Sequence, residues 1–448
     1  MKNTNQDKLL ALQSIIPKHL RVKSILFCIL TIGFISCSNN SLEEPSLQEK
    51  STEELNDIEA LQINEEDFYT PPTSYAVTKN FVEDYGADTI FDTDDSVKLQ
   101  NAIDDVFTSG GGKLIIPKGN YSLSEIEMKS NVHIIVNSEA VIRPSTRPDN
   151  KNFRVFSFGK ETAVVENVSI SSSNGEKFTV DLTKSTNINV AVFNLNNVNN
   201  FLISDFIVED NYTDFSAVTM GITNYNDAYY WPRNGVVKNG NTLNSDYGYG
   251  LIQVQAAKNV FFKDLEGTGG VTLRFETGWT FMNDLQQGGV EDMFAENISC
   301  TNGNAAVMVS PHAMHNGKVY VNGVTANGCG FGIRVESGFV SNKYSTPGLI
   351  DGTFKEVTIL NVTGTFSKDK AQIKPKHYEF MPCNLREFID PNPIKTGGKS
   401  YWGPSMSVVL NAPNYTVNLD EDSVTGAGFT AGYVVVTEED AISDEDCN

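Results

Sequence analysis

The feature that most limits the possible folds is a strand-turn-strand unit that recurs along the middle of the chain. It is seen at residues 259–276, 292–310 and 318–336, and residues 200–207 resemble its first half. In each copy an alternating apolar run, a Gly or Asn turn and a second alternating run follow one another. The repeat length of 26 to 34 residues is long for hairpin strands. The pattern therefore predicts a solenoid of stacked coils rather than a β-sandwich, the usual globular alternative.

Composition agrees with a large β-rich domain. The chain has 448 residues, of which 40% are hydrophobic, so it can bury a core and is not disordered throughout. Plentiful Gly, Asn and Thr suit short strands joined by turns. The formal net charge of −22 excludes a general nucleic-acid binder, because phosphate binding needs a basic surface.

The N-terminal residues 1–36 have the pattern of an export signal. Basic residues precede an apolar stretch at Ser24–Ser36, which is shorter than the roughly 20 residues needed to span a bilayer. Phe34-Ile-Ser-Cys37 resembles a bacterial lipobox, so Cys37 is predicted to carry lipid. The alternative is an ordinary secretory signal with an incidental cysteine. We expect an outer-membrane or cell-surface lipoprotein whose only membrane contact is its lipid anchor.

The remaining chain divides by charge into three parts. Residues 37–72 are strongly acidic and predict a flexible linker, residues 73–437 the β domain, and residues 438–448 an acidic tail. The four cysteines of the mature chain outside the lipid site are Cys300, Cys329, Cys383 and Cys447. None forms a Cys-x-x-Cys zinc pair, and we expect buried free thiols rather than disulfides, although export permits oxidation.

One helix is predicted, at residues 94–107. Its apolar face would consist of Val97, Leu99, Ile103, Val106 and Phe107, with Asp94 or Asp95 as its N-cap.

The sequence around this helix resembles the opening of pectate-lyase-type proteins. The resemblance rests on Tyr85-Gly-Ala-Asp88, Gly110-Gly-Gly112, Ile116-Pro-Lys-Gly-Asn-Tyr121 and Ser130-Asn-Val-His-Ile-Ile135. It implies an all-β fold, a right-handed parallel β-helix or pectin-lyase-like solenoid, with an N-terminal capping helix. The helix would cover the open β edge of the first coil.

Stacking of the repeats brings acidic residues together before any activity is considered. Glu276, Ser310 and Glu336 occupy equivalent outward positions on three successive coils, so the two acids would lie roughly 10 Å apart. Inverting glycosidases need two carboxyl groups at about 6.5–9.5 Å. Arg274 and Arg334 lie two residues before the acids and could hold them ionised or recruit an anionic ligand. The alternative is a ladder of surface salt bridges.

Aromatic side chains follow the same strands. Trp279 comes just after Glu276, and Tyr229-Tyr-Trp231, Tyr247 and Tyr249 crowd a neighbouring region. Such rings stack on sugar faces or serve as packing.

A series of motifs in one order narrows the function. They are Leu251-Ile-Gln253, Leu273-Arg-Phe-Glu276-Thr277, Gln287-Gly-Gly289, Ala305-Ala-Val-Met308, Pro311-His-Ala-Met-His-Asn316, Ser337-Gly-Phe-Val340 and Gly403-Pro-Ser405. These motifs resemble those of the iota-carrageenases, glycoside hydrolase family 82. The resemblance implies an inverting endo-hydrolase that cuts β-1,4 bonds of iota-carrageenan, a sulfated algal polysaccharide.

The resemblance also implies roles for individual residues. Glu276 matches the general acid, and we expect burial to raise its pKa for that task. Gln253 and His312 match polar residues around the scissile bond. Gln253 also matches a residue that helps to hold an active-site chloride. No cofactor is expected to be required, although a chloride or calcium ion is possible by resemblance, and we expect a monomer.

The chain departs from the family pattern at two acids. Gly278 stands where the general-base Asp is usual, and Ser341 stands where a second acid is usual. Without a base, losses of about 10²–10⁴ in rate are typical. The replacements available in this chain are Glu336, Asp284, Asp292 and His312. The alternative is a carbohydrate-binding β-helix without hydrolytic activity.

Sulfate esters require basic side chains. Arg274, Arg334 and Trp279 are predicted to contact the substrate. Residues 366–399 hold seven bases against four acids, and this segment is predicted to be either a lid over the cleft or a solvated loop. A lyase or a polygalacturonase is less compatible with the sequence, since neither a calcium-binding acid cluster nor a Gly-His-Gly is evident.

Overall fold

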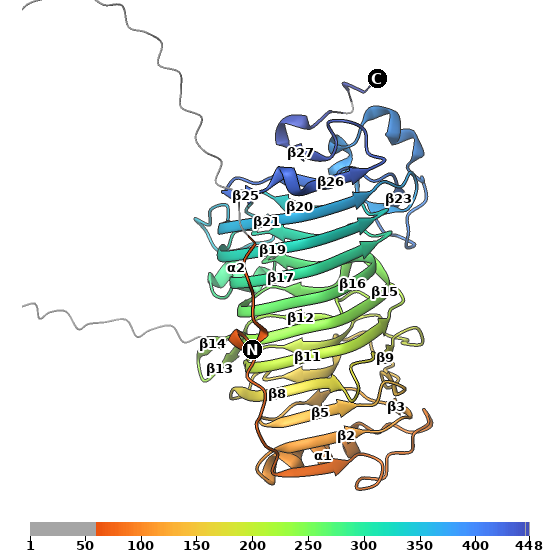
Figure 1. Cartoon of the computed structure of the whole chain (residues 1–448), viewed down its shortest axis with the longest axis vertical. Helices are drawn as coiled ribbons and strands as arrows, with labels where there is room; N and C mark the ends of the chain where they lie inside the picture. Colours follow the sequence, from red (N-terminus) through yellow and green to blue (C-terminus); the bar gives the residue numbers. More distant parts are fainter. Residues whose placement is uncertain (1–59, 444, 448) are drawn as a thin grey trace, which may run out of the picture. The chain divides into compact units, whose positions relative to one another are not determined.

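The computed structural model describes residues 60–443 and 445–447 (Figure 1). The export signal predicted at 1–36, Cys37 and most of the predicted linker lie outside the described residues and stay predictions. In the part of the chain that the structure describes, no helix is long and apolar enough to cross a membrane.

The described chain winds into a parallel β-helix whose strands form three columns of one 23-stranded sheet. The first column contains β1 (Val77–Asn80), β2 (Gly112–Ile116), β5 (Val132–Val136), β8 (Val165–Ser172), β11 (Val198–Glu209), β15 (Arg233–Val254), β16 (Ala257–Glu276), β17 (Val290–Thr301), β19 (His315–Asn327), β21 (Thr353–Thr365) and β25 (Val417–Leu419). In Figure 1 the coils rise from β2 near the bottom to β25 near the top.

The other two columns complete each coil. The second contains β3 (Asn120–Ser122), β6 (Val141–Arg143), β9 (Phe178–Asp181), the later halves of the long strands of the first column, and β26 (Val424–Ala427). The third contains β4 (Ile126–Glu127), β7 (Phe153–Phe158), β10 (Val190–Leu195), β12 (Val218–Met220), the ends of β15 and β16, β18 (Ala305–Ser310), β20 (Phe331–Glu336), β24 (Val409–Ala412) and β27 (Val435–Thr437).

Shorter elements decorate the coils. Two antiparallel pairs are formed by β13 (Thr223–Tyr225) with β14 (Ala228–Tyr230) and by β22 (Ala371–Ile373) with β23 (Tyr401–Gly403). The helices are α1 (Ser96–Thr108) and α2 (Thr280–Leu285), and the 3-10 helices are η1 (Glu65–Asp67), η2 (Pro375–Phe380), η3 (Cys383–Phe388), η4 (Glu421–Ser423) and η5 (Glu438–Asp440).

The register between coils confirms the predicted repeat and the parallel β-helix. In the third column Val307 pairs with Leu273 of the preceding coil and with Ile333 of the following coil. All three side chains are fully buried. Each coil therefore adds apolar side chains to one continuous core, and its alternate residues point outward to form the surface.

Interior aromatic residues carry much of the packing, and Phe262 is a fully buried example. Its ring meets that of Phe275 edge to face at 5.7 Å between centroids. We expect Phe262→Ala to lower the free energy of unfolding by about 3–5 kcal/mol, because it leaves a cavity in a closely packed core. Phe107→Ala, which removes a ring that is 44% exposed, serves as the matched control. Urea denaturation of both variants measures the difference, and equal losses would contradict this description of the core.

Helix α1 is the predicted capping helix, and it differs from the prediction in its buried face. It buries Leu99, Ala102, Ile103 and Val106. Val97 and Phe107, which we expected on this face, are 71% and 44% exposed. Because the helix covers the end of a coil rather than lying in a groove, only a narrow stripe is in contact. Asp95 is the N-cap residue, but its side chain makes no capping hydrogen bond.

The last residues of the predicted linker belong to the fold. Phe68 packs against Phe261 and Phe294, with ring centroids 5.4 and 5.2 Å away, and Glu65 pairs with Lys238 at 2.6 Å. In Figure 1 this segment, drawn in red, crosses the first column. The described part of the linker is therefore packed rather than free.

The expectation of free thiols is wrong for all four cysteines of the β domain and tail. Cys300 is bonded to Cys329, and Cys383 is bonded to Cys447. The first bond links neighbouring coils, where stacking brings the two side chains together. The second ties the acidic tail to η3.

Candidate active site

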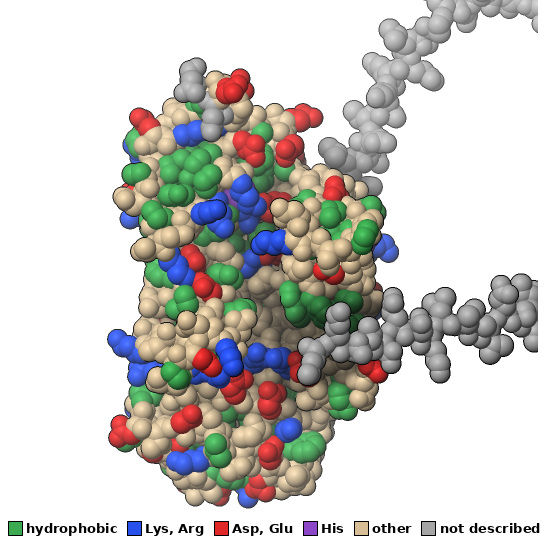
Figure 2. Space-filling view, turned by 180° about the vertical axis from the view of Figure 1, so that it is seen from behind, with side chains coloured by type: hydrophobic (Ala, Val, Ile, Leu, Met, Phe, Trp, Pro, Cys, Tyr) green, Lys and Arg blue, Asp and Glu red, His purple; other side chains and the backbone are tan. Residues whose placement is uncertain are grey.

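The polar residues singled out in the sequence meet on the third column, at the ends of β15, β16 and β18. Gln253 pairs in register with Arg274, and Glu276 pairs with Ser310. The side chains of Gln253, Arg274, Glu276 and His312 line a cavity of about 580 Å³. Figure 2, seen from behind, shows a hollow on this face with Lys and Arg side chains at its rim.

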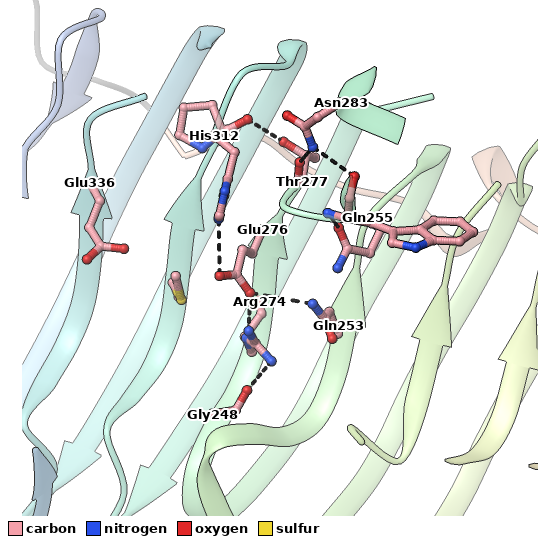
Figure 3. A network of polar contacts seen from close by, with 12 residues as sticks. Gly248, Gln253, Gln255, Arg274, Glu276, Thr277, Asn283, His312 and Glu336 are labelled. Carbon is pink, nitrogen blue, oxygen red and sulfur yellow. Dashed lines mark hydrogen bonds and ion pairs between the residues drawn. The ribbon is translucent and has the colours of Figure 1, made fainter. Parts of the chain in front are cut away.

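Glu276 is the centre of this cluster (Figure 3). One carboxylate oxygen, Oε2, accepts hydrogen bonds from Arg274 Nη2 and from Gln253 Nε2, the latter at 3.4 Å. The other, Oε1, lies 3.4 Å from His312 Nε2. The stacked coils therefore surround one carboxylate with three different polar groups.

The surroundings of Glu276 overturn our expectation about its acidity. Burial alone raises the pKa of this carboxyl, as expected. The Arg274 guanidinium and the hydrogen bond from His312 outweigh burial and lower the pKa to about 2. The carboxylate is therefore ionised near neutral pH in the free protein, and the expectation of a raised pKa is wrong for this state.

His312 is held by both its backbone and its ring. Its φ of 51° lies in the left-handed region, which few residues other than glycine adopt. Its carbonyl accepts hydrogen bonds from the N–H groups of Phe339 at 2.9 Å and Gly352 at 2.7 Å. Its Nδ1 lies 2.8 Å from the hydroxyl of Tyr344. Residues 339–352 therefore form a loop whose two ends and middle all contact His312.

Tyr344 is a site residue that the sequence did not reveal. Burial raises its pKa to about 12, so its hydroxyl keeps the proton and can donate to Nδ1 of His312. Nε2 then carries the ring proton and donates toward the ionised Glu276. A hydroxyl both donates and accepts, so Tyr344 can support either tautomer of the ring.

The space beside Gly278 is filled by this histidine. A Cβ atom at Gly278 would lie 2.5 Å from Nε2 of His312. An aspartate there could not fit without moving the ring. The His312 ring can therefore occupy its position only because residue 278 has no side chain.

Asp284 and Asp292, two of the candidate bases, lie apart from Glu276. Asp284 Oδ1 accepts hydrogen bonds from the N–H groups of Ser345 at 2.7 Å and Thr346 at 3.1 Å. This carboxylate clamps the loop that carries Tyr344. Asp292 lies in the first-column part of β17.

Glu336 lies on β20, two coils from Glu276 as predicted, and it is tightly paired. Its carboxylate lies 2.8 Å from Lys376 Nζ, 3.1 Å from His377 Nε2 and 3.9 Å from Arg334 Nη1. Burial raises its pKa, but Arg334 and the other two partners together lower it well below its usual value. Its oxygens therefore fasten residues 376–377 to the β-helix.

Arg334 occupies a different position from the one expected of a substrate-binding residue. Its side chain is 3% exposed, and Nη1 contacts the hydroxyl of Tyr247 at 3.0 Å and His377 at 2.8 Å. Burial lowers the pKa of His377 to about 3, so this ring is neutral. Arg334 is thus a buried counter-charge beneath the segment that covers it.

The basic segment 366–399 takes the lid alternative rather than that of a solvated loop. Lys374, Lys395 and Lys399 line the same cavity as Glu276, together with Lys343 of the Tyr344 loop. Burial lowers the pKa of Lys374, which lies 4.3 Å from the centre of the Tyr247 ring. The cavity is therefore roofed by basic side chains.

A second cavity, of about 960 Å³, continues the groove toward the N-terminal coils. Gln253 and Gln255 line both cavities. Its walls include Trp279 and Phe281, whose rings are 5.3 Å apart and are each 42% exposed. The groove thus has a basic end at Glu276 and an aromatic shelf beside it. Tyr247, another aromatic residue that the sequence suggested for stacking on sugars, is buried and packs within the protein.

Among the described residues, no group of three or more His, Cys, Asp or Glu side chains could hold a metal ion. The chloride or calcium ion suggested by resemblance stays a prediction.

Comparison with known proteins gives consistent matches. No family model matches the chain. An iota-carrageenase from Zobellia galactanivorans is 34% identical over 482 residues, covering 93% of this chain and 95% of that protein. An iota-carrageenase from Alteromonas macleodii is 42% identical over 275 residues, covering 61% and 56% of the two chains.

Solved structures agree with this match. A 1,3-alpha-1,4-beta-D-galactose-4-sulfate-3,6-anhydro-D-galactose-2-sulfate 4 galactohydrolase superposes with a TM-score of 0.81 at 33% identity, covering 86% of this chain and 96% of that one. An iota-carrageenase in complex with iota-carrageenan fragments superposes with a TM-score of 0.80 at 31% identity, covering 87% and 97%.

Proposed function

This chain belongs to the iota-carrageenase family, and we propose that it is an endo-acting, inverting hydrolase of the β-1,4 linkages of iota-carrageenan or a related sulfated galactan. The observation that carries the proposal is the position of Glu276. It lies in a groove roofed by lysines, in contact with Arg274, Gln253 and His312.

Glu276 acts as the general acid. Its carboxyl donates a proton to the leaving glycosidic oxygen, a task that typically contributes about 10²–10⁴-fold to the rate. Gln253 reaches Oε2 and keeps the carboxyl oriented toward the groove.

His312 acts as the general base in place of the missing aspartate. Its ring lies against Gly278 and within 3.4 Å of Glu276, whereas Glu336, two coils away, is held by ion pairs to Arg334 and Lys376 and by a contact with the neutral His377 ring. When Glu276 carries its proton, the ring proton can move to Nδ1 and be donated to Tyr344, which leaves Nε2 free to accept a proton from water. His312 therefore takes the role for which the sequence offered Glu336 as the first candidate.

Sulfate groups and sugar faces have separate partners in the groove. Arg274 and the lysines at 343, 374, 395 and 399 supply positive charge around Glu276. Trp279 and Phe281 supply exposed ring faces beside it. This arrangement suits a polymer that is both anionic and built of rings.

The proposal is tested by incubating the protein with iota-, kappa- and lambda-carrageenan and measuring new reducing ends. We expect release from iota-carrageenan in excess of the other two. The second candidate, a carbohydrate-binding protein without hydrolytic activity, is favoured by the glycine at position 278. It predicts tight binding of iota-carrageenan with no reducing ends released.

Gly278→Asp tests whether His312 has replaced the usual base. A side chain at this position meets the imidazole at 2.5 Å, so the substitution displaces the ring. We expect kcat on iota-carrageenan to fall by about tenfold or more, because the displaced ring no longer orients the water. A rise in kcat would mean that the chain simply lacks its base and that His312 does not serve as one. Gly278→Ala is the matched control, because its Cβ meets the same ring without adding a carboxylate, and it should lose kcat to the same extent.

A further inference from the structure

The proposed function leaves one step unexplained, namely how Glu276 acquires the proton that it donates. In the free protein this carboxylate is paired with Arg274 and hydrogen-bonded by His312. Both contacts favour the charged form. A general acid must instead be protonated when the substrate is in place.

Arg274 is the contact that decides the charge of Glu276. Its Nη2 donates to Glu276 and its Nη1 donates to the carbonyl of Gly248. The Arg274 side chain is only 9% exposed, and its buried Nε has no hydrogen-bond partner. The guanidinium therefore holds Glu276 without satisfying all of its own donors, and it lines the cavity where an anion would enter.

The rest of the cavity is built to attract that anion. Lys343 comes from the Tyr344 loop, and Lys374, Lys395 and Lys399 come from the lid segment 366–399. Lys395 is already paired with Asp214 at 2.6 Å. The Lys374 ammonium lies over the face of the Tyr247 ring, and burial lowers its pKa. A negative charge that enters the cavity would raise this pKa again.

We propose that a sulfate ester of the bound galactan binds Arg274 and the adjoining lysines and thereby causes Glu276 to take up a proton. The inference rests on the proposed function. The sulfate competes for the guanidinium and places a second negative charge beside the carboxylate, and both effects favour the neutral carboxyl. The proton comes from water, passes to the leaving glycosidic oxygen, and is balanced by the proton that His312 removes from the attacking water.

Consequently, sulfate is more than an anchor for the polymer. A galactan that lacks the sulfate nearest the scissile bond leaves Glu276 ionised, so it is cut slowly even where it binds. The charge of the substrate selects for turnover as well as for affinity.

Several other titratable groups line the cavity around Glu276. They are His312, Asp246, Tyr247, Tyr249, Lys343, Lys374, Lys395 and Lys399, with Glu336 and Arg334 acting on Glu276 from two coils away. A total proton count therefore does not identify Glu276. The difference between the protein and a Glu276→Gln variant does, because glutamine has the same shape and does not titrate.

The experiment is titration calorimetry at about pH 6 in buffers of different ionisation enthalpy. The probe is the set of end-product oligosaccharides from an iota-carrageenan digest, which the protein no longer shortens. A chemically desulfated form of the same oligosaccharides is the control. With the sulfated probe, we expect the wild-type protein to bind more protons per complex than the Glu276→Gln variant does, by as much as about one proton. With the desulfated probe, at concentrations that saturate the protein, we expect the wild-type protein and the Glu276→Gln variant to take up the same number of protons.

Equal proton uptake by the protein and by Glu276→Gln, in a protein that cleaves iota-carrageenan, would overturn the inference and leave the proposed function in place. Absence of both cleavage and binding would overturn the proposed function and the inference with it. A larger uptake that the desulfated probe reproduces would also overturn the inference, since sulfate would then not be the cause.

Discussion

Glu276→Gln is expected to lower kcat on iota-carrageenan by about 10²–10⁴-fold, because it removes the proton donor and keeps the shape of the side chain. The amide can still accept a hydrogen bond from Arg274 and face His312. KM should change by much less than kcat, since the groove lysines and aromatic shelf are untouched. Reducing-end assays over a range of polymer concentrations separate the two parameters.

The matched control for this variant is Glu356→Gln. Glu356 is a half-exposed acid that pairs with Lys318 at 2.8 Å on the first column. We expect wild-type kcat from it, since a single surface ion pair contributes little. If Glu276→Gln kept wild-type turnover, the general acid would have to be sought elsewhere in the groove.

His312→Gln is expected to produce a loss of kcat of similar size, about 10²–10⁴-fold, because it removes the group that accepts a proton from water. Tyr344→Phe should lower kcat less, and at unchanged KM, since it only removes the hydrogen bond that fixes the ring. His315→Gln is the matched control, because His315 is an exposed histidine that contacts Thr353 at 3.0 Å. Measuring kcat for all three variants on iota-carrageenan tests the assignment.

If Glu336 rather than His312 were the general base, the losses of kcat would fall in the opposite order. If Glu336 were the base, Glu336→Gln would lose turnover and His312→Gln would keep most of it. Under our account, Glu336→Gln loosens Lys376 and His377 and acts mainly on KM, because the lid loses an anchor.

The coil architecture could be predicted because apolar and polar residues alternate along each strand and the same pattern recurs in each repeat. Val307 and its partners Leu273 and Ile333 follow from the same inward position in each repeat. In-register stacking then places Glu276 and Glu336 two coils apart without further information. The helix followed from its apolar spacing and its capping role from the resemblance to pectate-lyase-type proteins. Val97 and Phe107 proved to be exposed, because the area that the helix covers is narrow.

The parts that escaped prediction come from segments outside the repeat. Tyr344 contacts His312 from a loop that Asp284 holds at the next residue, and neither Tyr344 nor Asp284 belongs to a periodic pattern. The burial of Arg334 under His377 depends on how the lid folds back. A side chain placed by a loop leaves no periodic signal, so stacking rules could not locate it.

The pKa of Glu276 shows a second limit. Glu276 is partly buried, and burial alone would raise its pKa. The strength of the Arg274 contact depends on atomic distances that the sequence does not contain. The neighbours of a buried carboxyl, more than its burial, decide its charge in the free protein.

The configuration of the anomeric carbon in the first hydrolysis product shows whether Glu276 and His312 act as an acid and a base on one displacement by water. Proton NMR during the first minutes of iota-carrageenan hydrolysis, before mutarotation, distinguishes the two anomers. Because Glu276 has an imidazole rather than a second carboxylate beside it, we predict a single displacement by water and an α-anomer from the β-linkage. A β-anomer would require a covalent intermediate on a nucleophile and would contradict the pairing of Glu276 with His312.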